Sequence, residues 1–450
     1  MITNTEKQKA LHVKIPLLIA ELNDRLIERD ELSRLVILAM LSKSHMFLIG
    51  ERGVAKSKTV ELINGVIEGS KFWQLQVNEE TKQNELFGEK QSGEDGTVGY
   101  ISKKNILNTH YAVLDEMYKG RNGLLNGLLE LLVDGCYTSG DGIKRKTPLL
   151  AIFGTSNEYP TETYMLPYVD RFLVWYEVKR IQDPDNRKKY YAGDYEKSPI
   201  SNRYFSLDDI EHITYEKNHI EIPDFIIEYF DSIVTALITQ RVKTSDRKYE
   251  RVLHGMIKVS AYLNNRHSVD ISDLFLLLHT TWHDDIEKEK VYRVVFEEIF
   301  GCKEEIDSLI IKASQDMEST DAYKNGNIYD FLNYKDKNDG TDNDTLYRKV
   351  LYVANEALKS YKMIQNGINI MIEKYQDNIM IERLLQNNLF VIDYKQNAFT
   401  NSMLKRIDTL KDSIEKRISE LTQWLNDNPT LFEYQNNFSQ NSKGGKNANK

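Results

Sequence analysis

Residues 47–57 read Phe47-Leu48-Ile49-Gly50-Glu51-Arg52-Gly53-Val54-Ala55-Lys56-Ser57, and this stretch decides the fold. Its apolar start predicts a buried strand, and the pattern that follows predicts a helix beginning near Lys56. A glycine loop that ends in Lys-Ser between a strand and a helix is typical of phosphate binding, because backbone N–H groups and the positive end of the helix converge on phosphate oxygens. The spacing is G-x-x-x-x-A-K-S, with Ala55 where the general pattern has glycine. We therefore interpret the stretch as a variant phosphate loop.

The loop supplies most of the predicted nucleotide ligands. Lys56 can reach the β- and γ-phosphates, and the Ser57 hydroxyl can bind Mg²⁺. The predicted cofactor-binding residues are Gly50, Glu51, Arg52, Gly53, Val54, Ala55, Lys56, Ser57, Lys58 and Asp115. The alternative is an ordinary strand-to-helix turn, and three later segments make that alternative weaker.

Acidic and amide side chains follow two further apolar segments. Asp115 and Glu116 end the segment that begins at Tyr111, and Asn157 follows an apolar segment at 149–154. Asp115 can hold Mg²⁺ opposite Ser57, and Glu116 can orient the water that attacks the γ-phosphate. Asn157 can place its amide beside Asp115 and this water. An acidic strand end without function and an Asx turn at Asn157 are the alternatives.

Two arginines are candidates for stabilising charge on the transferred phosphoryl group. Arg171 follows Asp170 at the start of an apolar segment, where it would point toward the γ-phosphate of a neighbouring subunit. Arg247 lies at the start of a predicted helix capped by Ser245, and it could reach back to the phosphates. Arg251, one turn later, could do so instead. A surface Asp-Arg pair and solvated helix arginines are the alternatives.

The order of apolar segments predicts the domain organisation. Strands are expected at 46–49, 72–77, 111–116, 149–154 and 172–178, with helices between them, which favours a parallel sheet covered on both faces. From about residue 206 only helices are expected, at 207–240, 245–264, 270–282, 346–385 and 401–426. We therefore expect a nucleotide-binding core at 1–200, a helical lid at 201–300, a C-terminal helical domain with a long hairpin at 301–435 and a disordered tail at 436–450.

Composition excludes several classes of protein. The hydrophobic fraction of 41% and the charged fraction of 28% are ordinary for a globular protein. A net charge of −9 argues against general electrostatic binding of nucleic acid. The apolar runs are too short to cross a membrane, and the two cysteines, Cys136 and Cys302, have no metal-ligand spacing. We expect a cytoplasmic protein without membrane insertion.

In their order along the chain, these segments resemble the MoxR family of AAA+ ATPases, and most closely its RavA branch. The likeness covers roughly residues 15–285 and is carried by 53–57, by Asn84-Glu85-Leu86-Phe87-Gly88, by the leucine-rich segment 123–132 and by Ser245-Asp246-Arg247-Lys248-Tyr249. The resemblance implies an α/β P-loop NTPase, with an AAA+ core of a parallel sheet between helices, an all-α lid and an extended helical domain. It also implies two inserted hairpins, at 88–104 and 134–148, that face the pore of a hexameric ring.

The resemblance further implies Mg²⁺-dependent ATP hydrolysis by a homo-oligomer, a hexamer, that remodels or matures a partner protein containing a von Willebrand A domain. In that role Lys56, Glu116, Asn157, Arg171 and Arg247 would be the catalytic residues, and Ser57 and Asp115 would hold the metal. Two features depart from the branch: Glu51-Arg52 replaces its Pro-Pro, and no β-rich module interrupts the C-terminal helices.

Two other functions stay open at this point. The chain can be a nucleotide-dependent assembly switch or scaffold with incidental turnover, although such a protein does not need Glu116. It can also be a nucleic-acid-associated motor, for which Lys103-Lys104 and Lys144-Arg145-Lys146 would place positive charge on the two hairpins.

Overall fold

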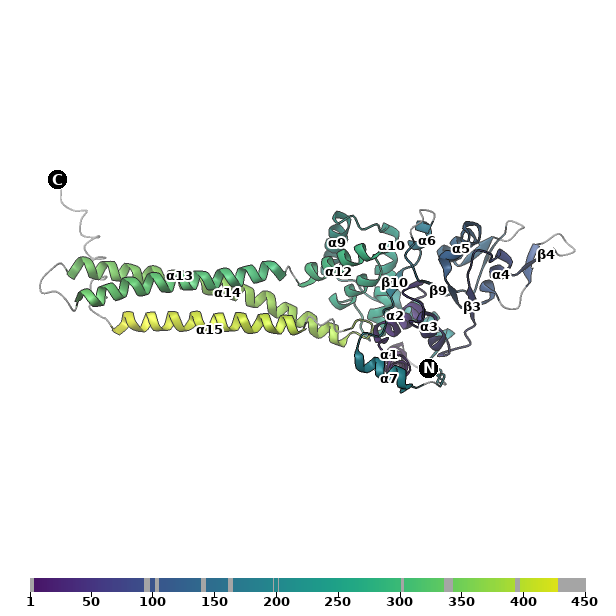
Figure 1. The fold of residues 1–450 in the computed structure, drawn as a ribbon, viewed down its shortest axis with the longest axis horizontal. Helices are drawn as coiled ribbons and strands as arrows, with labels where there is room; N and C mark the ends of the chain where they lie inside the picture. The colour runs from purple at the N-terminus through teal and green to yellow at the C-terminus, as the bar shows by residue number, and fades with distance from the viewer. Residues whose placement is uncertain are drawn as a thin grey trace. The chain divides into compact units, whose positions relative to one another are not determined.

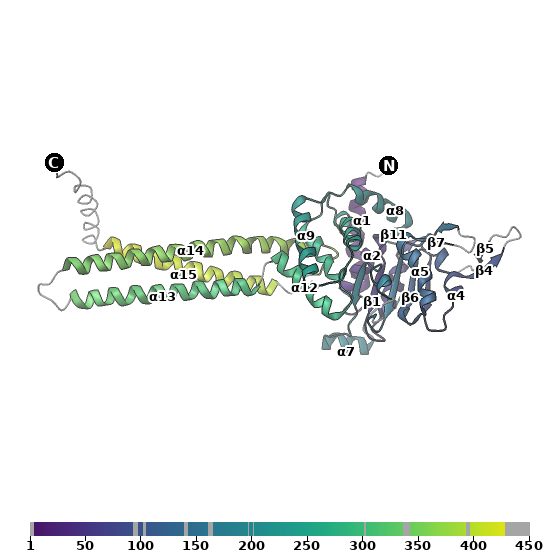
Figure 2. The ribbon, with the colours of Figure 1, turned by 90° about the horizontal axis from the view of Figure 1, so that it is seen from above.

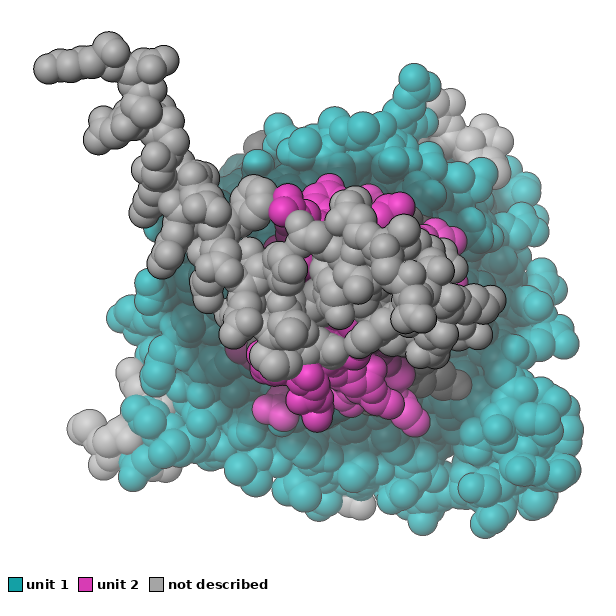
Figure 3. Space-filling view, turned by 90° about the vertical axis from the view of Figure 1, so that its left-hand side faces the viewer, with its two compact units in different colours: residues 1–300, 384–392 teal, residues 301–383, 393–450 magenta. Residues whose placement is uncertain are grey.

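The computed structural model covers the 450-residue chain and describes residues 4–92, 98–101, 105–138, 143–160, 165–196, 198–200, 202–300, 303–335, 343–392 and 397–427. By its internal contacts the chain divides into unit 1, residues 1–300 and 384–392, and unit 2, residues 301–383 and 393–450 (Figure 3). The expected tail at 436–450 and Cys302 lie outside the described residues.

Unit 1 is built around a five-stranded parallel sheet with the strand order β10-β1-β9-β6-β3. The strands are β1 (Met46–Ile49), β3 (Phe72–Gln76), β6 (Tyr111–Asp115), β9 (Ala151–Ser156) and β10 (Val174–Glu177). Every residue of β1 and β9 is buried, because both faces of the sheet are covered. The predicted α/β fold class and its five strands are confirmed, and the strand ends differ from the prediction by at most two residues.

Helices packed on the sheet fix the position of the loop that follows β1. The first are α1 (Asn4–Asn23) and α2 (Asp30–Leu41), followed by α3 (Lys56–Asn64), and α2 contacts α1, α3 and β10. Helix α3 contacts β6 and β9, so the loop before it lies at the carboxyl edge of the central strands. The remaining core helices are α4 (Gln83–Phe87), α5 (Asn122–Asp134), α6 (Leu166–Val169) and α7 (Pro184–Ala192), shown in Figure 1. Helix α7 was not predicted.

Two antiparallel hairpins stand at the predicted positions. Strands β4 (Glu89–Ser92) and β5 (Val98–Ile101) form the first, and β7 (Cys136–Thr138) and β8 (Lys144–Lys146) form the second. The residues 93–97, 102–104 and 139–142, and with them Lys103 and Lys104, lie outside the described residues. A short parallel pair, β2 (Ile67–Glu68) with β11 (Phe205–Ser206), leads into the lid.

The lid is helical, as the sequence predicted. It contains α8 (Leu207–Glu216), α9 (Asp224–Thr239), α10 (Asp246–Arg251), α11 (Lys258–Leu263) and α12 (Asp285–Phe300). A π-helical segment, Val252–Ile257, joins α10 to α11, so residues 246–263 form one uninterrupted helix. The segment predicted at 270–282 is a 3₁₀ helix, Ile271–His279.

Unit 2 consists of three long helices, α13 (Lys303–Lys335), α14 (Asn343–Asn387) and α15 (Asn397–Asp427), which lie side by side (Figures 1 and 2). Their shared apolar core includes Ile310, Met317, Ala354, Ala357, Tyr361, Ile368, Ile407, Ile414, Leu421 and Leu425. Residues 384–392, which the sequence analysis placed in the C-terminal domain, belong to unit 1 by their contacts. Within the described part of the chain, no helix combines the length and apolarity needed to cross a membrane.

Candidate nucleotide-binding site

The loop between β1 and α3 has the backbone of a phosphate loop. Gly50 has a φ of 150°, and a Cβ atom there would lie 2.3 Å from the carbonyl oxygen of Val178, so only glycine fits. Ala55 has a φ of 68° and a ψ of 32°, which is the left-handed conformation. Ala55 therefore differs from the glycine of the general pattern less in the room it takes than in the backbone strain it carries.

The ammonium group of Lys56 lies at the mouth of this loop. Its Nζ donates to the carbonyl oxygens of Gly50 at 2.6 Å and Glu51 at 2.9 Å, and to Oδ1 of Asn157 at 2.8 Å. Burial lowers the pKa of Lys56, and the carboxylates of Glu116 and Asp115 oppose this shift. The three acceptors hold the ammonium where the phosphate oxygens of a nucleotide in the loop would meet it.

The carboxylate of Asp115 accepts hydrogen bonds from three side chains. Its Oδ1 accepts hydrogen bonds from the Ser57 hydroxyl and, at 3.0 Å, from the Thr155 hydroxyl, and its Oδ2 accepts one from Gln74 Nε2 at 2.6 Å. A hydroxyl beside a carboxylate is the kind of sparse oxygen site that Mg²⁺ uses together with phosphate and water. Ser57 and Asp115 therefore fit the predicted metal, which would neutralise phosphate charge when bound. Gln74 and Thr155 were not predicted from the sequence.

Asn157 joins the loop to the second acid. Its Nδ2 donates to Oε1 of Glu116, while its Oδ1 accepts from Lys56. Glu116 has a φ of 55° and a ψ of 39°, so its backbone is in the left-handed conformation directly after β6. Its Oε2 lies 3.3 Å from Lys119 Nζ. We call Lys56, Ser57, Asp115, Glu116 and Asn157 the phosphate-loop network, since their side chains are linked in two hydrogen-bonded groups around the loop.

A cavity of about 780 Å³ opens beside the loop. Arg52, Gly53, Val54, Ala55 and Lys58 line one side of it, and Tyr190, Tyr191 and Tyr195 line another. The rings of Tyr190 and Tyr195 are stacked, with centroids 5.6 Å apart and an interplanar angle of 9°. Aromatic rings beside a phosphate loop can stack on a nucleotide base. These tyrosines were not predicted from the sequence, although three tyrosines within a polar segment were a usable signal.

Arg29, a residue that we also expected near the adenine, lines the same cavity, but its guanidinium is hydrogen-bonded to backbone carbonyl oxygens. It is 7% exposed. Its Nη2 donates to the carbonyl oxygens of Val54 at 3.1 Å and Lys179 at 2.8 Å, and its Nη1 donates to Glu28 at 2.7 Å. Burial lowers the pKa of Arg29. Arg29 therefore holds the phosphate loop in place from the start of α2.

Besides Lys56, three residues of the predicted loop ligands have charged side chains, and the positions of these side chains differ. The Glu51 carboxylate is paired with Arg180, with an Nε–O distance of 2.6 Å, so this residue offers the loop its backbone. Arg52 is exposed and lines the cavity. Lys58 also lines the cavity, and its Nζ lies 3.6 Å from Glu61.

Arg171, Arg247 and Arg251 form a second charged region, which we call the arginine cluster. Arg171 Nη1 lies 3.3 Å from Asp170, and Asp170 also accepts hydrogen bonds from Ser245 of the lid. Burial lowers the pKa of Arg251, and the charges of Arg247 and Arg171 act in the same direction. Within the described residues, no hydrogen bond or ion pair joins Arg247 or Arg251 to a partner.

The arginine cluster changes the interpretation of Arg247. From its place in the sequence, Arg247 was expected to be able to reach back to the phosphates of its own chain. In the structure its charge acts on Arg251 and Asp134, whereas the charges acting on Lys56 come from Glu116, Asp115 and Arg52. Arg247 thus shares a region with Arg171 and has no contact with the phosphate loop among the described residues.

Comparisons with known proteins agree with this geometry. Residues 13–214 match the family model described as the MoxR domain in MoxR-vWA-beta-propeller ternary systems, and residues 221–295 match an AAA lid domain. Two uncharacterised proteins of Methanocaldococcus jannaschii are relatives: MJ0079 is 28% identical over 89% of this chain and 97% of its own length, and MJ0812 is 30% identical over 61% of this chain and 73% of its own length.

A solved structure shares the fold at low sequence identity. The crystal structure of a "putative ATPase" from Cytophaga hutchinsonii aligns with a TM-score of 0.53 and 17% identity, over 66% of this chain and 97% of that one. The family models find no separate evidence for the RavA branch, which stays a prediction. Taken with the phosphate loop, the parallel sheet and the helical lid, these matches show that the chain belongs to the MoxR family of AAA+ ATPases.

Proposed function

We propose that this protein hydrolyses ATP with Mg²⁺ in an oligomeric ring. The observation that carries the proposal is the position of Asn157, whose amide contacts both the phosphate-binding Lys56 and the acid Glu116. Glu116 would orient the attacking water, Lys56 would neutralise the β/γ oxygens, and Asn157 would report the γ-phosphate to Glu116. Ser57 and Asp115 would hold the metal.

The arginine cluster supports a ring in which each site is completed by a neighbour. Arg171 and Arg251 share the carboxylate of Asp170, and Arg247, whose charge acts on Arg251 and Asp134, adds a third positive charge. A triphosphate is an anion that would balance this charge. Among the described residues no contact joins the cluster to the phosphate loop of its own chain, so we assign Arg171 and Arg247 to the γ-phosphate bound by the adjacent subunit. A head-to-tail interface of this kind closes into a ring, for which we propose a hexamer.

The work of the ring is proposed from its family. The matching model is described for MoxR-vWA-beta-propeller systems, so we propose a partner with a von Willebrand A domain and a chaperone-like role in its remodelling or maturation. The nucleic-acid alternative is weakened at the second hairpin. Lys144 Nζ lies 2.5 Å from Asp134 and 4.0 Å from Glu130, and these acids offset its charge.

Steady-state ATPase activity and light-scattering mass, with and without nucleotide, test the proposal. Wild type is compared with Glu116→Gln and with Glu158→Gln, a matched change at an exposed acid two residues beyond β9. We expect wild type and Glu158→Gln to turn over ATP, and Glu116→Gln to bind ATP and assemble with a turnover lower by about 10²–10⁴, the usual contribution of a positioned base.

Two outcomes would contradict the proposed ATP hydrolysis. If wild type binds ATP and assembles but turns over no faster than Glu116→Gln, hydrolysis is not its function and the assembly-switch alternative replaces it. If wild type does not bind ATP, both readings of the phosphate loop fail.

A further inference from the structure

A short segment far along the chain returns to unit 1. The chain passes into unit 2 after residue 300, and residues 384–392 come back from the end of α14 to contact unit 1 before α15 begins in unit 2. We call residues 384–392 the clasp. Leu385, Asn388, Phe390 and Val391 of the clasp are buried. Unit 2 is therefore tied to unit 1 at the clasp as well as at residue 300.

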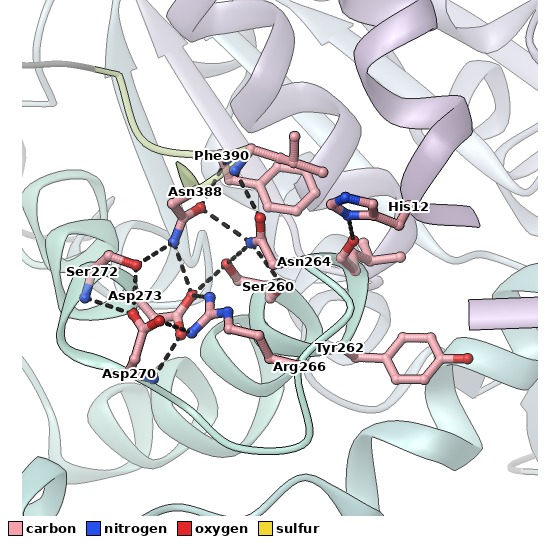
Figure 4. A network of polar contacts seen from close by, with 12 residues as sticks. His12, Ser260, Tyr262, Asn264, Arg266, Asp270, Ser272, Asp273, Asn388 and Phe390 are labelled. Carbon is pink, nitrogen blue, oxygen red and sulfur yellow. Dashed lines mark hydrogen bonds and ion pairs between the residues drawn. The ribbon is translucent and has the colours of Figure 1, made fainter. Parts of the chain in front are cut away.

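The clasp is hydrogen-bonded to the lid through a buried amide (Figure 4). Asn388 is 4% exposed. Its Nδ2 donates to the Ser272 hydroxyl at 2.8 Å and to Asp273 Oδ1 at 3.1 Å, while its Oδ1 accepts from Asn264 at 3.2 Å. Asn264 in turn accepts from the backbone N–H of Leu389 at 2.8 Å. A buried amide with its donors and acceptors satisfied holds the two segments in one arrangement.

The lid side of this network is charged and buried. Asp273 is fully buried and accepts hydrogen bonds from Ser260 at 2.7 Å and from Arg266 Nη2 at 2.8 Å. Arg266 Nη1 lies 2.5 Å from Asp270, which also accepts from Ser272. Removing the clasp would expose Asp273 and leave these groups with fewer partners, so its release has a free-energy cost.

The clasp also contacts the helix that supports the phosphate loop. Arg34 of α2 donates through Nη1 to the carbonyl oxygen of Leu389 at 2.7 Å, and its Nε donates to Asp30 at 2.8 Å. Arg29, the residue immediately before Asp30, holds the carbonyl oxygen of Val54 in the phosphate loop. A short path of hydrogen bonds and α2 backbone therefore connects the loop to the clasp.

We propose that the clasp couples the nucleotide state of unit 1 to the C-terminal helices of unit 2. The clasp joins the lid network of Asn264, Ser272 and Asp273 to α2, and α2 positions the phosphate loop through Arg29. This coupling rests on the proposed binding of ATP at the loop. A movement of the loop or lid on nucleotide binding changes the geometry at Asn388, and the helices that continue from both ends of the clasp receive that change.

One helix connects the arginine cluster to the hydrogen-bonded network of the clasp. The uninterrupted helix 246–263 carries Arg247 and Arg251 near its first turn, and Ser260 near its last turn contacts Asp273. The π-helical segment between them, Val252–Ile257, is the kind of local irregularity that recurs at functional positions of helices. Thus both the nucleotide of the chain itself and that of a neighbour can act on the clasp.

Hydrogen–deuterium exchange of the full-length Glu116→Gln protein, with and without saturating ATP and Mg²⁺, tests the coupling. The backbone N–H groups of Leu389 and Phe390 are hydrogen-bonded within the network, so their exchange reports opening of the clasp. We expect peptides across 385–391 to exchange at least about fivefold more slowly with ATP, the lower end of typical coupling between sites. Unchanged or faster exchange there, with peptides across 50–57 protected by ATP, would overturn the coupling.

The same data separate this inference from the function on which it rests. If peptides across 50–57 show no protection, ATP does not bind and the proposed function fails first. A pair of asparagine variants gives the reciprocal measurement. Because coupling is mutual, Asn388→Ala, which removes the buried amide that closes the clasp, should weaken ATP binding by up to the factor by which ATP slows exchange at the clasp. Asn387→Ala at the exposed neighbouring position should leave binding unchanged. Equal ATP affinity in two folded variants would contradict the proposal.

Discussion

The phosphate-loop network and the arginine cluster differ in how their charges are balanced. In the network, each ionised side chain has an opposite charge or a hydrogen-bonding group beside it, from Lys56 and Asn157 to Ser57 and Asp115. In the cluster, Arg171 and Arg251 share Asp170, and the side chains of Arg247 and Arg251 have no hydrogen bond or ion pair within the described residues. The first region is complete in one chain, and the second has charge available for an external anion.

The difference in charge balance indicates that the arginine cluster is the part of the molecule suited to an anion from outside the chain. Bringing like charges together without a counter-ion is unfavourable, and burial increases the cost, as the lowered pKa of Arg251 indicates. A stable protein retains such a cluster when binding or catalysis uses it. The comparison therefore predicts different phenotypes for changes in the two regions, and a defect in one should be rescued by an intact copy of the other.

The largest effect is expected for Arg171→Ala. Its loss should lower turnover by about 10³ or more, as for arginines supplied to phosphoryl transfer by a neighbour, with ATP binding retained. Arg293→Ala is the matched control, because Arg293 is an exposed lid arginine that contacts Gln240. Steady-state ATPase assays and nucleotide titrations measure the two quantities.

Mixing two inactive proteins decides whether Arg171 acts between subunits. In a one-to-one mixture of Arg171→Ala and Glu116→Gln, about a quarter of the interfaces of a head-to-tail ring pair an intact Glu116 with an intact Arg171. Turnover should recover toward about that fraction of the wild-type rate. If the subunits exchange but the mixture stays as inactive as the separate proteins, Glu116 and Arg171 act in the site of one chain. The two regions would then not belong to different subunits.

A change at the cavity sharpens the description of the phosphate-loop side. Tyr190→Ala should raise the Kd for ATP by about tenfold, since loss of one base–aromatic stack is worth about 1–3 kcal/mol, and kcat should be nearly unchanged. Tyr215→Ala, at an exposed lid tyrosine outside the cavity, is the control. A fall in kcat at constant Kd would mean that Tyr190 acts on the chemical step and not on the base.

These two regions also show what sequence alone can predict. The strands, the loop and the acids after β6 were predicted because each depends on a local pattern of a few adjacent residues. Asp115 and Glu116 reach the loop because the carboxyl ends of parallel strands share one edge of the sheet, so chain order was sufficient to anticipate their neighbourhood.

The features that were missed depend on packing between distant segments. Gln74 and Thr155 contact Asp115 from neighbouring strands, and Tyr190 comes to the cavity on a helix that has no apolar periodicity to reveal it. The clasp joins residues more than a hundred positions apart. The charge of Arg247 acts on Arg251, and its expected reach to the phosphates stays a prediction, because a motif places a residue on a helix but does not say which way that helix faces.

The arginine side can be probed by pH through Lys248, which follows Arg247. Lys248 is buried, its Nζ lies 3.1 Å from His283, and burial lowers its pKa to about 7, with Asp170 and Glu287 opposing and Arg251 assisting. Unfolding restores a pKa of about 10.4, so between about pH 7 and 10 the unfolded chain binds a proton that the folded chain lacks. The free energy of unfolding of wild type should therefore rise with pH relative to Lys248→Met.

The quantity to measure is the slope, against pH, of the difference in free energy of unfolding between wild type and Lys248→Met. It should approach about 1.4 kcal/mol per pH unit in the middle of the window and vanish below about pH 7, where both states are protonated. Chemical denaturation at several pH values gives it, and Lys243→Met, at an exposed lysine nearby in the chain, should show no such slope. If the difference in the free energy of unfolding does not change with pH, Lys248 stays charged in the folded protein. The region of the arginine cluster would then carry one more positive charge than the lowered pKa of Lys248 indicates.

The smallest effect is expected at Ala55, where the loop itself carries strain. A left-handed alanine costs roughly 1–2 kcal/mol relative to a right-handed one, and glycine adopts the same φ of 68° without that penalty but loses more backbone entropy on folding. Ala55→Gly should therefore raise the free energy of unfolding by about 0.5–1 kcal/mol, with ATP binding retained because the N–H groups of the loop stay in place. Thermal unfolding with and without ATP measures both. Ala192→Gly, at the last residue of α7, where φ is not positive, should instead destabilise. If Ala55→Gly also destabilises, the alanine is not strained, and the two regions differ only in their charge.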